Sequence, residues 1–421
     1  MSFQQGLSGL NATSKHLEII GNNIANANTY GAKVARAEFG DVYAASLNGA
    51  GANQVGIGTS LAAVSQQFTQ GNITATSNPM DLAINGSGFF QVSNGNGPTN
   101  YTRNGQFKVD RDGYIVTNSQ MRLMGYPANG NGIVVPGQSV PIQLPTGGIA
   151  PAQSTEVIMG GFLNSEEAVT LPAVAPFLSV TNGDTYNRAT SQTVYDAKGQ
   201  EVTIVYYFQK TAQNTWDVYG TANGDFINGD TANPLPLTTL VFQPDGGALI
   251  SPVGAVAVPV PQTPAAPAIA KTVPLPDLTI DFSGMEEYGG LWGITDMRQN
   301  GYSAGQLSSI AIEGNGIVMA RYSNGQSQAA GQIEIATFRN PQGLRQLGGN
   351  EWALSYASGD PVRGVPGDGN LGSIQAGALE ESNVDLTGEL VSMITAQRIY
   401  QANAQTIKTM DQVMQTLVNL R

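Results

Sequence analysis

Residues 386–421 read LTGELVSMITAQRIYQANAQTIKTMDQVMQTLVNLR, and the spacing of their apolar side chains predicts one long helix. No proline interrupts the stretch, and Asn383 and Asp385 just before it are residue types that cap helix N-termini. A helix of about 35 residues extends roughly 50 Å. Because its outer face carries few charges, we expect a partner to cover it on more than one side. The stripe consists of Leu386, Leu390, Met393, Gln397, Tyr400, Ala404, Ile407, Met410, Met414, Leu417 and Leu420.

The other end of the chain predicts a second, shorter helix. Ser2 and Gln5 have the spacing of a capping box, in which each side chain satisfies a backbone donor of the first turn. Gly31 provides a residue that tolerates the left-handed conformation that often ends a helix. An amphipathic helix docked on its own domain is the simpler interpretation of this pattern, and a subunit contact is the alternative. The apolar stripe consists of Phe3, Leu7, Leu10, Leu17, Ile20 and Ile24.

The middle of the chain predicts strands and turns. Residues 82–90 (LAINGSGFF) and 310–318 (IAIEGNGIV) repeat one pattern, in which a glycine-containing turn separates two apolar runs. Residues 193–195 and 202–209 predict a hairpin across the turn at 196–199. We infer a discontinuous β domain at about 71–147 and 284–372, with an inserted domain at 148–283.

Composition excludes several classes of protein. The 421 residues contain no Cys and a single His, which removes disulfide scaffolds, thiolate chemistry and sites that need two imidazoles. The formal net charge of -12 disfavours nucleic acid and anionic membrane surfaces as partners. No long apolar run predicts membrane insertion, and the N-terminus lacks the pattern of a cleaved signal peptide.

Candidate chemical motifs have ordinary structural explanations. The glycines at 56–58 and 86–88 lack the context of a phosphate-binding loop. The acid pairs at 110/112, 166–167, 286–287 and 380–381 are typical of solvated turns or of opposite strand faces rather than of a catalytic pair. Asp225, Asn228 and Asp230 offer oxygen ligands for calcium, although their register departs from an EF-hand. We therefore predict no catalytic residues, cofactor or metal, and we expect His16 to be a surface or subunit-contact residue.

Both ends of the chain contain short distinctive motifs. At the N-terminus they are GLNA at 9–12, GNNIAN at 21–26 and NTYG at 28–31. At the C-terminus they are GALE at 377–380, SNVDL at 382–386, LVSMI at 390–394, and Gln397, Arg398, Tyr400 and Gln401. With these motifs, both ends resemble the bacterial flagellar axial proteins, the rod and hook family. Length and the large middle region make the chain more similar to hook than to rod members, which are generally shorter. Ala32 departs from the family pattern, which often has an aromatic residue there.

The resemblance implies an α+β multidomain fold with a coiled-coil-like inner domain and two mainly β outer domains nested in the chain. The helices at 1–28 and 380–421 would form the inner polymerisation domain, and 29–70 would be a linker to the β domains at 71–147 with 284–372 and at 148–283. The expected subunit interface comprises Phe3, Leu7, Leu10, Leu17, Ile24, Leu386, Leu390, Met393, Tyr400, Ile407, Met410, Met414, Leu417 and Leu420.

The resemblance also implies a non-enzymatic subunit of the flagellar hook, a curved tubular joint that transmits motor torque to the filament in motility. Its partners would be copies of itself, rod proteins, the hook cap protein, the hook-filament junction protein and the flagellar type III export apparatus. It would lie outside the cell without cleavage of a signal peptide. A distal rod subunit and an extracellular β-rich glycan-acting enzyme are the alternatives.

Overall fold

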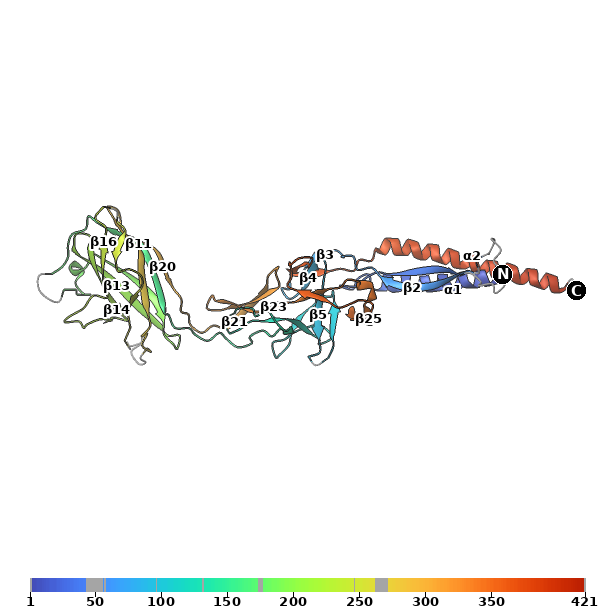
Figure 1. Ribbon diagram of the computed structural model, residues 1–421, viewed down its shortest axis with the longest axis horizontal. Helices are drawn as coiled ribbons and strands as arrows, with labels where there is room; N and C mark the ends of the chain where they lie inside the picture. The colour runs from blue at the N-terminus through green and yellow to red at the C-terminus, as the bar shows by residue number, and fades with distance from the viewer. Residues whose placement is uncertain are drawn as a thin grey trace. The chain divides into compact units, whose positions relative to one another are not determined.

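The computed structural model describes residues 2–42, 56, 58–95, 97–130, 132–172, 177–245, 247–261 and 272–419. It divides into two compact units. The first comprises Met1–Thr146, Ser309–Arg321 and Ser327–Arg421, and the second comprises Gly147–Ser308 and Tyr322–Gln326. Terminal helices and a body of many strands confirm the predicted α+β multidomain class (Figure 1).

Two helices form the ends of the chain. α1 spans Ser2–Ala25 and α2 spans Leu386–Asn419, so the long C-terminal helix is confirmed. They lie side by side (Figure 1). Gly6 of α1 faces Ile407 and Gly9 faces Asn403, which shows that the two helices run antiparallel. A Cβ on Gly9 would lie 2.9 Å from the Asn403 amide nitrogen. Small residues on α1 therefore allow the two helices to approach closely.

A hairpin covers another side of α1. β1 (Ala35–Val42) pairs antiparallel with β2 (Gly58–Gln66), within the region expected to be a linker. The Gln5 side chain donates to the Gly56 carbonyl at 2.7 Å, and the Thr59 amide donates to Ser8 Oγ at 3.3 Å. The Gln5 side chain thus binds the segment before β2, and the side chain of Ser2, the other half of the predicted capping box, lies outside the described residues. Gly31 does adopt a positive φ of 72°, but it lies six residues beyond the end of the helix.

The body of the first unit is a β structure with one main core. Buried side chains include Leu82, Phe90, Ile115, Val318 and Ile335. The repeated sequence pattern is confirmed, because each copy forms two strands separated by a glycine-containing turn. A sheet of 13 described strands and two short pairs, β28–β4 and β29–β3, make up this body. The strands are β3 (Ile73–Ala75), β4 (Leu82–Asn85), β5 (Phe89–Ser93), β6 (Thr99–Thr102), β7 (Lys108–Val109), β8 (Ile115–Val116), β9 (Arg122–Pro127), β10 (Val140–Pro141), β21 (Leu307–Ile312), β22 (Ile317–Tyr322), β23 (Ser327–Ile333), β24 (Ile335–Thr337), β25 (Arg345–Gly348), β26 (Glu351–Ala353), β27 (Val362–Gly364), β28 (Ser373–Ala376) and β29 (Ala378–Glu380).

The second unit packs a four-stranded and a six-stranded sheet around its own core. β12 and β13 confirm the predicted hairpin, with Tyr195 opposite Glu201. Core side chains include Trp216, Phe208, Phe282 and Met285, all essentially inaccessible to solvent. The strands are β11 (Glu156–Asn164), β12 (Arg188–Tyr195), β13 (Glu201–Ala212), β14 (Thr215–Ala222), β15 (Asp225–Phe226), β16 (Thr238–Phe242), β17 (Leu249–Ser251), β18 (Val256–Ala257), β19 (Thr279–Tyr288) and β20 (Gly293–Gln299).

The end of the inserted region differs from the boundary placed at 283. That position falls inside β19, whose Phe282 and Met285 both pack in the second unit's core. β20 also belongs to this unit, because it pairs with β11. The unit therefore continues to Ser308.

Candidate functional site

The predicted interface residues of α1 are partly open to solvent. Phe3 and Leu7 are exposed, with 52% of the Phe3 surface accessible. Leu10, Leu17 and Ile24 are half-buried. The apolar side chains at the start of α1 thus lie on a surface that the described chain does not cover.

The predicted residues of α2 divide in the same way. Leu386, Leu390, Tyr400 and Met414 are exposed, whereas Met393, Ile407 and Met410 are half-buried. Ile407 packs against Gly6 of the same chain, so this part of the stripe makes an intramolecular contact. The side chain of Leu417 and the whole of Leu420 lie outside the described residues.

Further exposed apolar residues of α2 lie outside the predicted set. A second apolar stripe on the same helix is the sequence signal for most of them, and Val418 continues the first stripe, four residues after Met414. They are Val391, Ile394, Ile399, Val413 and Val418. α2 thus presents apolar side chains on more than one face, and we call the exposed set on α1 and α2 the helical surface.

α2 continues past the start of α1 (Figure 1). Gly6 faces Ile407, and α1 begins only four residues before Gly6, so Val413 and Met414 lie beyond the reach of an antiparallel α1. Met414 is 63% exposed. The last turns of α2 therefore have apolar side chains and no α1 segment opposite them.

A buried charge cluster fixes the chain segments next to these helices to the β body. Glu380, at the end of β29, accepts from Lys33 Nζ at 2.6 Å and from Arg103 Nη1 at 3.0 Å. The Glu380 and Lys33 side chains are fully buried, and that of Arg103 is nearly so. We call these three residues the Glu380 cluster. It joins the segment after α1, the segment after β6 and the segment before α2.

Further hydrogen bonds extend the Glu380 cluster. The Lys33 amine also donates to the Thr69 carbonyl at 2.8 Å, and Arg103 Nη2 donates to the Gly86 carbonyl at 2.8 Å. Gly71 donates its amide to the Glu380 carboxylate at 2.9 Å. Charged groups this deeply buried require such compensation.

Burial lowers the pKa of both cations in the cluster, Lys33 and Arg103. Desolvation lowers the pKa of the Lys33 amine, while the charge of Glu380 and its hydrogen bond act in the opposite direction. Burial likewise lowers the pKa of the Arg103 guanidinium against the same carboxylate. One carboxylate thus compensates two buried cations, and its removal would leave both without a counter-charge.

Two asparagines tie the base of the hairpin to the helices. Asn383 accepts from the Val34 amide and donates to the Gln67 carbonyl, both at 2.8 Å. Asn23 exchanges two hydrogen bonds with the backbone of Ala35 and also donates to Glu389 of α2 at 3.1 Å. Both edges of the hairpin base are therefore held by side chains from the terminal segments.

Of the two explanations given for acids 380–381, a solvated turn does not fit Glu380, which ends β29 and is buried, whereas Glu381 is partly exposed. The partners of Glu380 come from distant parts of the sequence, so local turn rules could not identify them. Opposite charges at Lys33 and Glu380, in terminal segments of a chain with only 12% charged residues, were the available signal.

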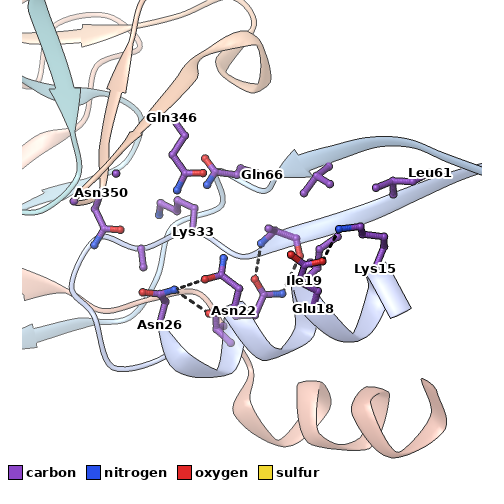
Figure 2. Close-up of a pocket in the computed structure, with 17 residues that line it drawn as sticks. Lys15, Glu18, Ile19, Asn22, Asn26, Lys33, Leu61, Gln66, Gln346 and Asn350 are labelled. Carbon is purple, nitrogen blue, oxygen red and sulfur yellow. Dashed lines mark hydrogen bonds and ion pairs between the residues drawn. The ribbon is translucent and has the colours of Figure 1, made fainter. Parts of the chain in front are cut away.

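A groove lies between α1, β2 and the turn that joins β25 to β26 (Figure 2). Its volume is about 820 Å³. Several amide side chains line it, including Asn22, Asn26, Gln66, Gln346 and Asn350. Apolar patches come from Ile19, Leu61 and Val64. The groove therefore offers both polar and apolar contacts.

The candidate calcium ligands take part in local hydrogen bonds. Asp230 Oδ1 accepts from the amides of Ala232 and Asn233, and Asn228 donates to the Pro236 carbonyl. Among the described residues, no group of three or more His, Asp or Glu side chains is placed to hold a metal ion. Neither described helix has the length and apolar character needed to cross a membrane.

Comparison with known proteins gives matches along the whole chain. Residues 3–33 match the flagella basal body rod protein family, and 83–157 match the flagellar hook protein FlgE/F/G D1 domain. Residues 163–302 match the flagellar basal body protein FlaE D2 domain, and 375–420 match the flagellar basal body rod FlgEFG protein C-terminal region. The flagellar hook protein FlgE of Salmonella typhimurium is 41% identical over 423 residues, with 100% of each chain covered. The chain belongs to the flagellar hook protein family.

Other members of this family are similar over nearly the same length. The FlgE proteins of Escherichia coli K12 and Rhizobium meliloti are 41% and 34% identical, covering 100% of this chain and 100% and 98% of their own. The crystal structure of Helicobacter pylori flagellar hook protein FlgE2 matches with a TM-score of 0.53 at 16% identity. That match covers 73% of this chain and 100% of the other, and it supports the fold.

The Glu380 cluster draws one residue from each of three matched regions of the hook protein family. Lys33 lies in the N-terminal match, Arg103 in the D1 match and Glu380 in the C-terminal match. The cluster is thus where the three regions are joined in this chain.

Proposed function

We propose that this chain is the structural subunit of the flagellar hook and that it polymerises through the helical surface. The observation that carries the proposal is the exposed apolar side chains of α2, including Leu390 and the unopposed Met414. Apolar side chains grouped on an exposed helix mark sites of protein association.

The two helices have different roles in this proposal. α1 packs on α2 and on the hairpin within one chain, which leaves Phe3 and Leu7 exposed. α2 extends beyond α1 and offers its end to another subunit. A contact between two different surfaces of the same chain does not close on itself, so it generates an open helical polymer.

Packing between subunits would complete the folding of the terminal helices. Isolated helices are marginally stable in water, and tertiary packing provides most of their stability. In the free subunit, the end of α2 would fray, and burial against neighbours would order it. This coupling would limit polymerisation before the subunit reaches its site of assembly.

The remaining assignments follow family membership and are part of the same proposal. The helical domain, 1–28 and 380–421, would lie innermost in a curved tube, with the linker at 29–70 and the β domains outside it. Rod proteins, the hook cap protein and the hook-filament junction protein would be its neighbours, after export by the flagellar type III apparatus without a cleaved signal peptide. The subunit would act mechanically, not as an enzyme.

Amide hydrogen exchange on the purified subunit and its polymer tests this proposal. We expect peptides from the end of α2 to exchange rapidly in the subunit and to become protected in the polymer. Peptides from the second unit's core serve as the internal control and should be protected in both. Equal protection of α2 in the two states would contradict coupled ordering, and failure of the pure chain to form tubes would contradict the proposed function.

A further inference from the structure

The methionines of the chain differ widely in their exposure to solvent. The sequence contains 11 of them. Met159 and Met285 are completely enclosed in the core of the second unit. Among the methionines that the structure describes, Met414 is the most exposed. A small oxidant dissolved in water therefore reaches the sulfur atom of Met414 more readily than the others.

Met414 lies in the part of α2 that no α1 segment covers (Figure 1). Gly6, near the start of α1, faces Ile407, and Met414 follows about two turns further along α2. Met393 and Met410, the other two methionines of α2, are half-buried. Met414 thus differs from them in its surroundings and not in its secondary structure.

A methionine thioether undergoes two-electron oxidation by peroxides. Hydrogen peroxide transfers one oxygen atom to the sulfur and gives the sulfoxide. The sulfur lone pair forms the new S–O bond, the O–O bond breaks, and the second oxygen leaves as water after a proton shift from the first. The sulfur is oxidised and the peroxide is reduced. Reductases return the sulfoxide to the thioether, so the modification is reversible.

Oxidation changes the apolar side chain of Met414 into a polar one. The sulfoxide oxygen accepts hydrogen bonds, and water supplies them in the free subunit. The side chains one turn away on α2 offer no donor, because three are apolar and an ionised aspartate only accepts. They are Met410, Asp411, Leu417 and Val418. A sulfoxide buried here by another subunit would lose its hydrogen bonds to water without replacement from its own helix, which is unfavourable.

We propose that Met414 is a site of reversible oxidation and that its sulfoxide keeps the free subunit from polymerising. This inference rests on the proposed polymerisation through the helical surface, and it adds a chemical control of that surface. The reaction partner is a peroxide, and the reaction takes place before assembly. Once a neighbouring subunit covers the end of α2, the sulfur is no longer accessible.

Peptide mass mapping after brief exposure to hydrogen peroxide gives the first test. In the free subunit, we expect sulfoxide to accumulate at Met414 before it appears at Met393. Met159 and Met285 are internal controls for the folded state and should remain unoxidised. In preformed tubes treated in the same way, Met414 should be oxidised more slowly. Equal rates at Met414 and Met393 in the subunit, or equal rates at Met414 in subunit and tubes, would overturn the proposal.

The critical concentration of subunit for tube formation gives the second test. Oxidation of the unsubstituted chain should raise this concentration about tenfold or more, because assembly would bury a polar group without a hydrogen bond. Treatment with methionine sulfoxide reductase should restore the original value. No increase on oxidation, or no recovery after reduction, would contradict the proposal.

Two leucine variants identify the methionine responsible. Met414→Leu lacks the reactive sulfur, so peroxide should leave its critical concentration unchanged. Met393→Leu keeps Met414 and should respond to peroxide as the unsubstituted chain does. Each variant is compared with its own untreated sample, so that the effect of the substitution itself cancels. Equal responses of the two variants would reject Met414 as the controlling site, whereas absence of tubes from the untreated, unsubstituted chain would reject the proposed function and this inference with it.

Discussion

The core of the second unit and the paired terminal helices differ in how completely their apolar side chains are buried. In the second unit, Trp216, Phe208 and Phe282 are completely enclosed by two sheets. On the helices, Leu390 and Met414 remain exposed, 46% and 63% respectively. Burial of an apolar side chain contributes about 1.5 to 3 kcal/mol, so the helices retain a large unused driving force for association. One chain thus contains a unit with a complete core of its own and a pair of helices whose apolar surface the described chain leaves exposed.

The largest expected effect comes from placing a charge on the helical surface. Leu390→Asp should abolish tube formation, because assembly would bury an unpaired carboxylate. Sedimentation and electron microscopy measure the loss, and exchange of the second unit's amides should not change. Leu390→Met, which keeps an apolar side chain, is the control and should still assemble. Normal tubes from Leu390→Asp would remove Leu390 from the proposed interface.

Loss of the Glu380 carboxylate should have the next largest effect. Glu380→Ala leaves Lys33 and Arg103 buried without a counter-charge, which should destabilise the first unit by about 3 to 5 kcal/mol. Native-state hydrogen exchange measures the free energy of opening in each unit.

The adjacent acid supplies the matched control for this variant. Glu381→Ala removes a partly exposed carboxylate and should change stability by only about 0.5 kcal/mol. The second unit should keep its opening free energy in both variants. Equal effects at the two positions would show that the buried ion pairs do not hold the first unit together.

Alkaline pH should destabilise the second unit through its buried tyrosines. Burial, together with the charge of Asp217, raises the pKa of Tyr219 to about 12, above its unfolded value of about 10. Burial also raises the pKa of Tyr206. Since the unfolded chain releases these protons first, their contribution to stability is complete below pH 10 and falls as pH rises toward 12.

Near-ultraviolet circular dichroism and tyrosinate absorbance follow this loss. Tyr219→Phe removes one of the titrating groups and should make the decline with pH shallower. A decline of unchanged slope in this variant would assign the alkaline loss to other groups.

The smallest expected effect is a single methylene removed from the enclosed core. Ile204→Val should lower the stability of the second unit by about 0.5 to 1.5 kcal/mol. The critical concentration for polymerisation should be the same as for the unsubstituted chain. A change in tube formation would show that the second unit's core also influences assembly.

Local sequence patterns predicted the helices and strands well. They could not predict contacts between residues that are far apart in the sequence. The stripe from Leu386 predicted α2 because a period of three to four residues is a property of the sequence itself. Gln5 fits a capping box by spacing, but its side chain binds Gly56, which only the folded hairpin brings near. The predicted domain boundary at 283 fell inside β19. Apolar residues continue through this strand, so no sequence signal marks a boundary there.

The same distinction applies to the candidate site. Helical periodicity identified Leu390 and Met414 on the exposed surface of α2. It could not indicate which faces of α1 and α2 meet, because that depends on the small residues Gly6 and Gly9. The Glu380 cluster joins positions hundreds of residues apart and has no periodic signal.

The Glu380 cluster can form only after all three of its residues have been synthesised. Lys33 and Arg103 are synthesised before Glu380, which follows them by 347 and 277 residues. Until Glu380 is made, Lys33 and Arg103 lack the carboxylate that pairs with both of them, and β29 cannot yet pair with β3. A chain that terminates before Glu380 therefore cannot complete its first unit.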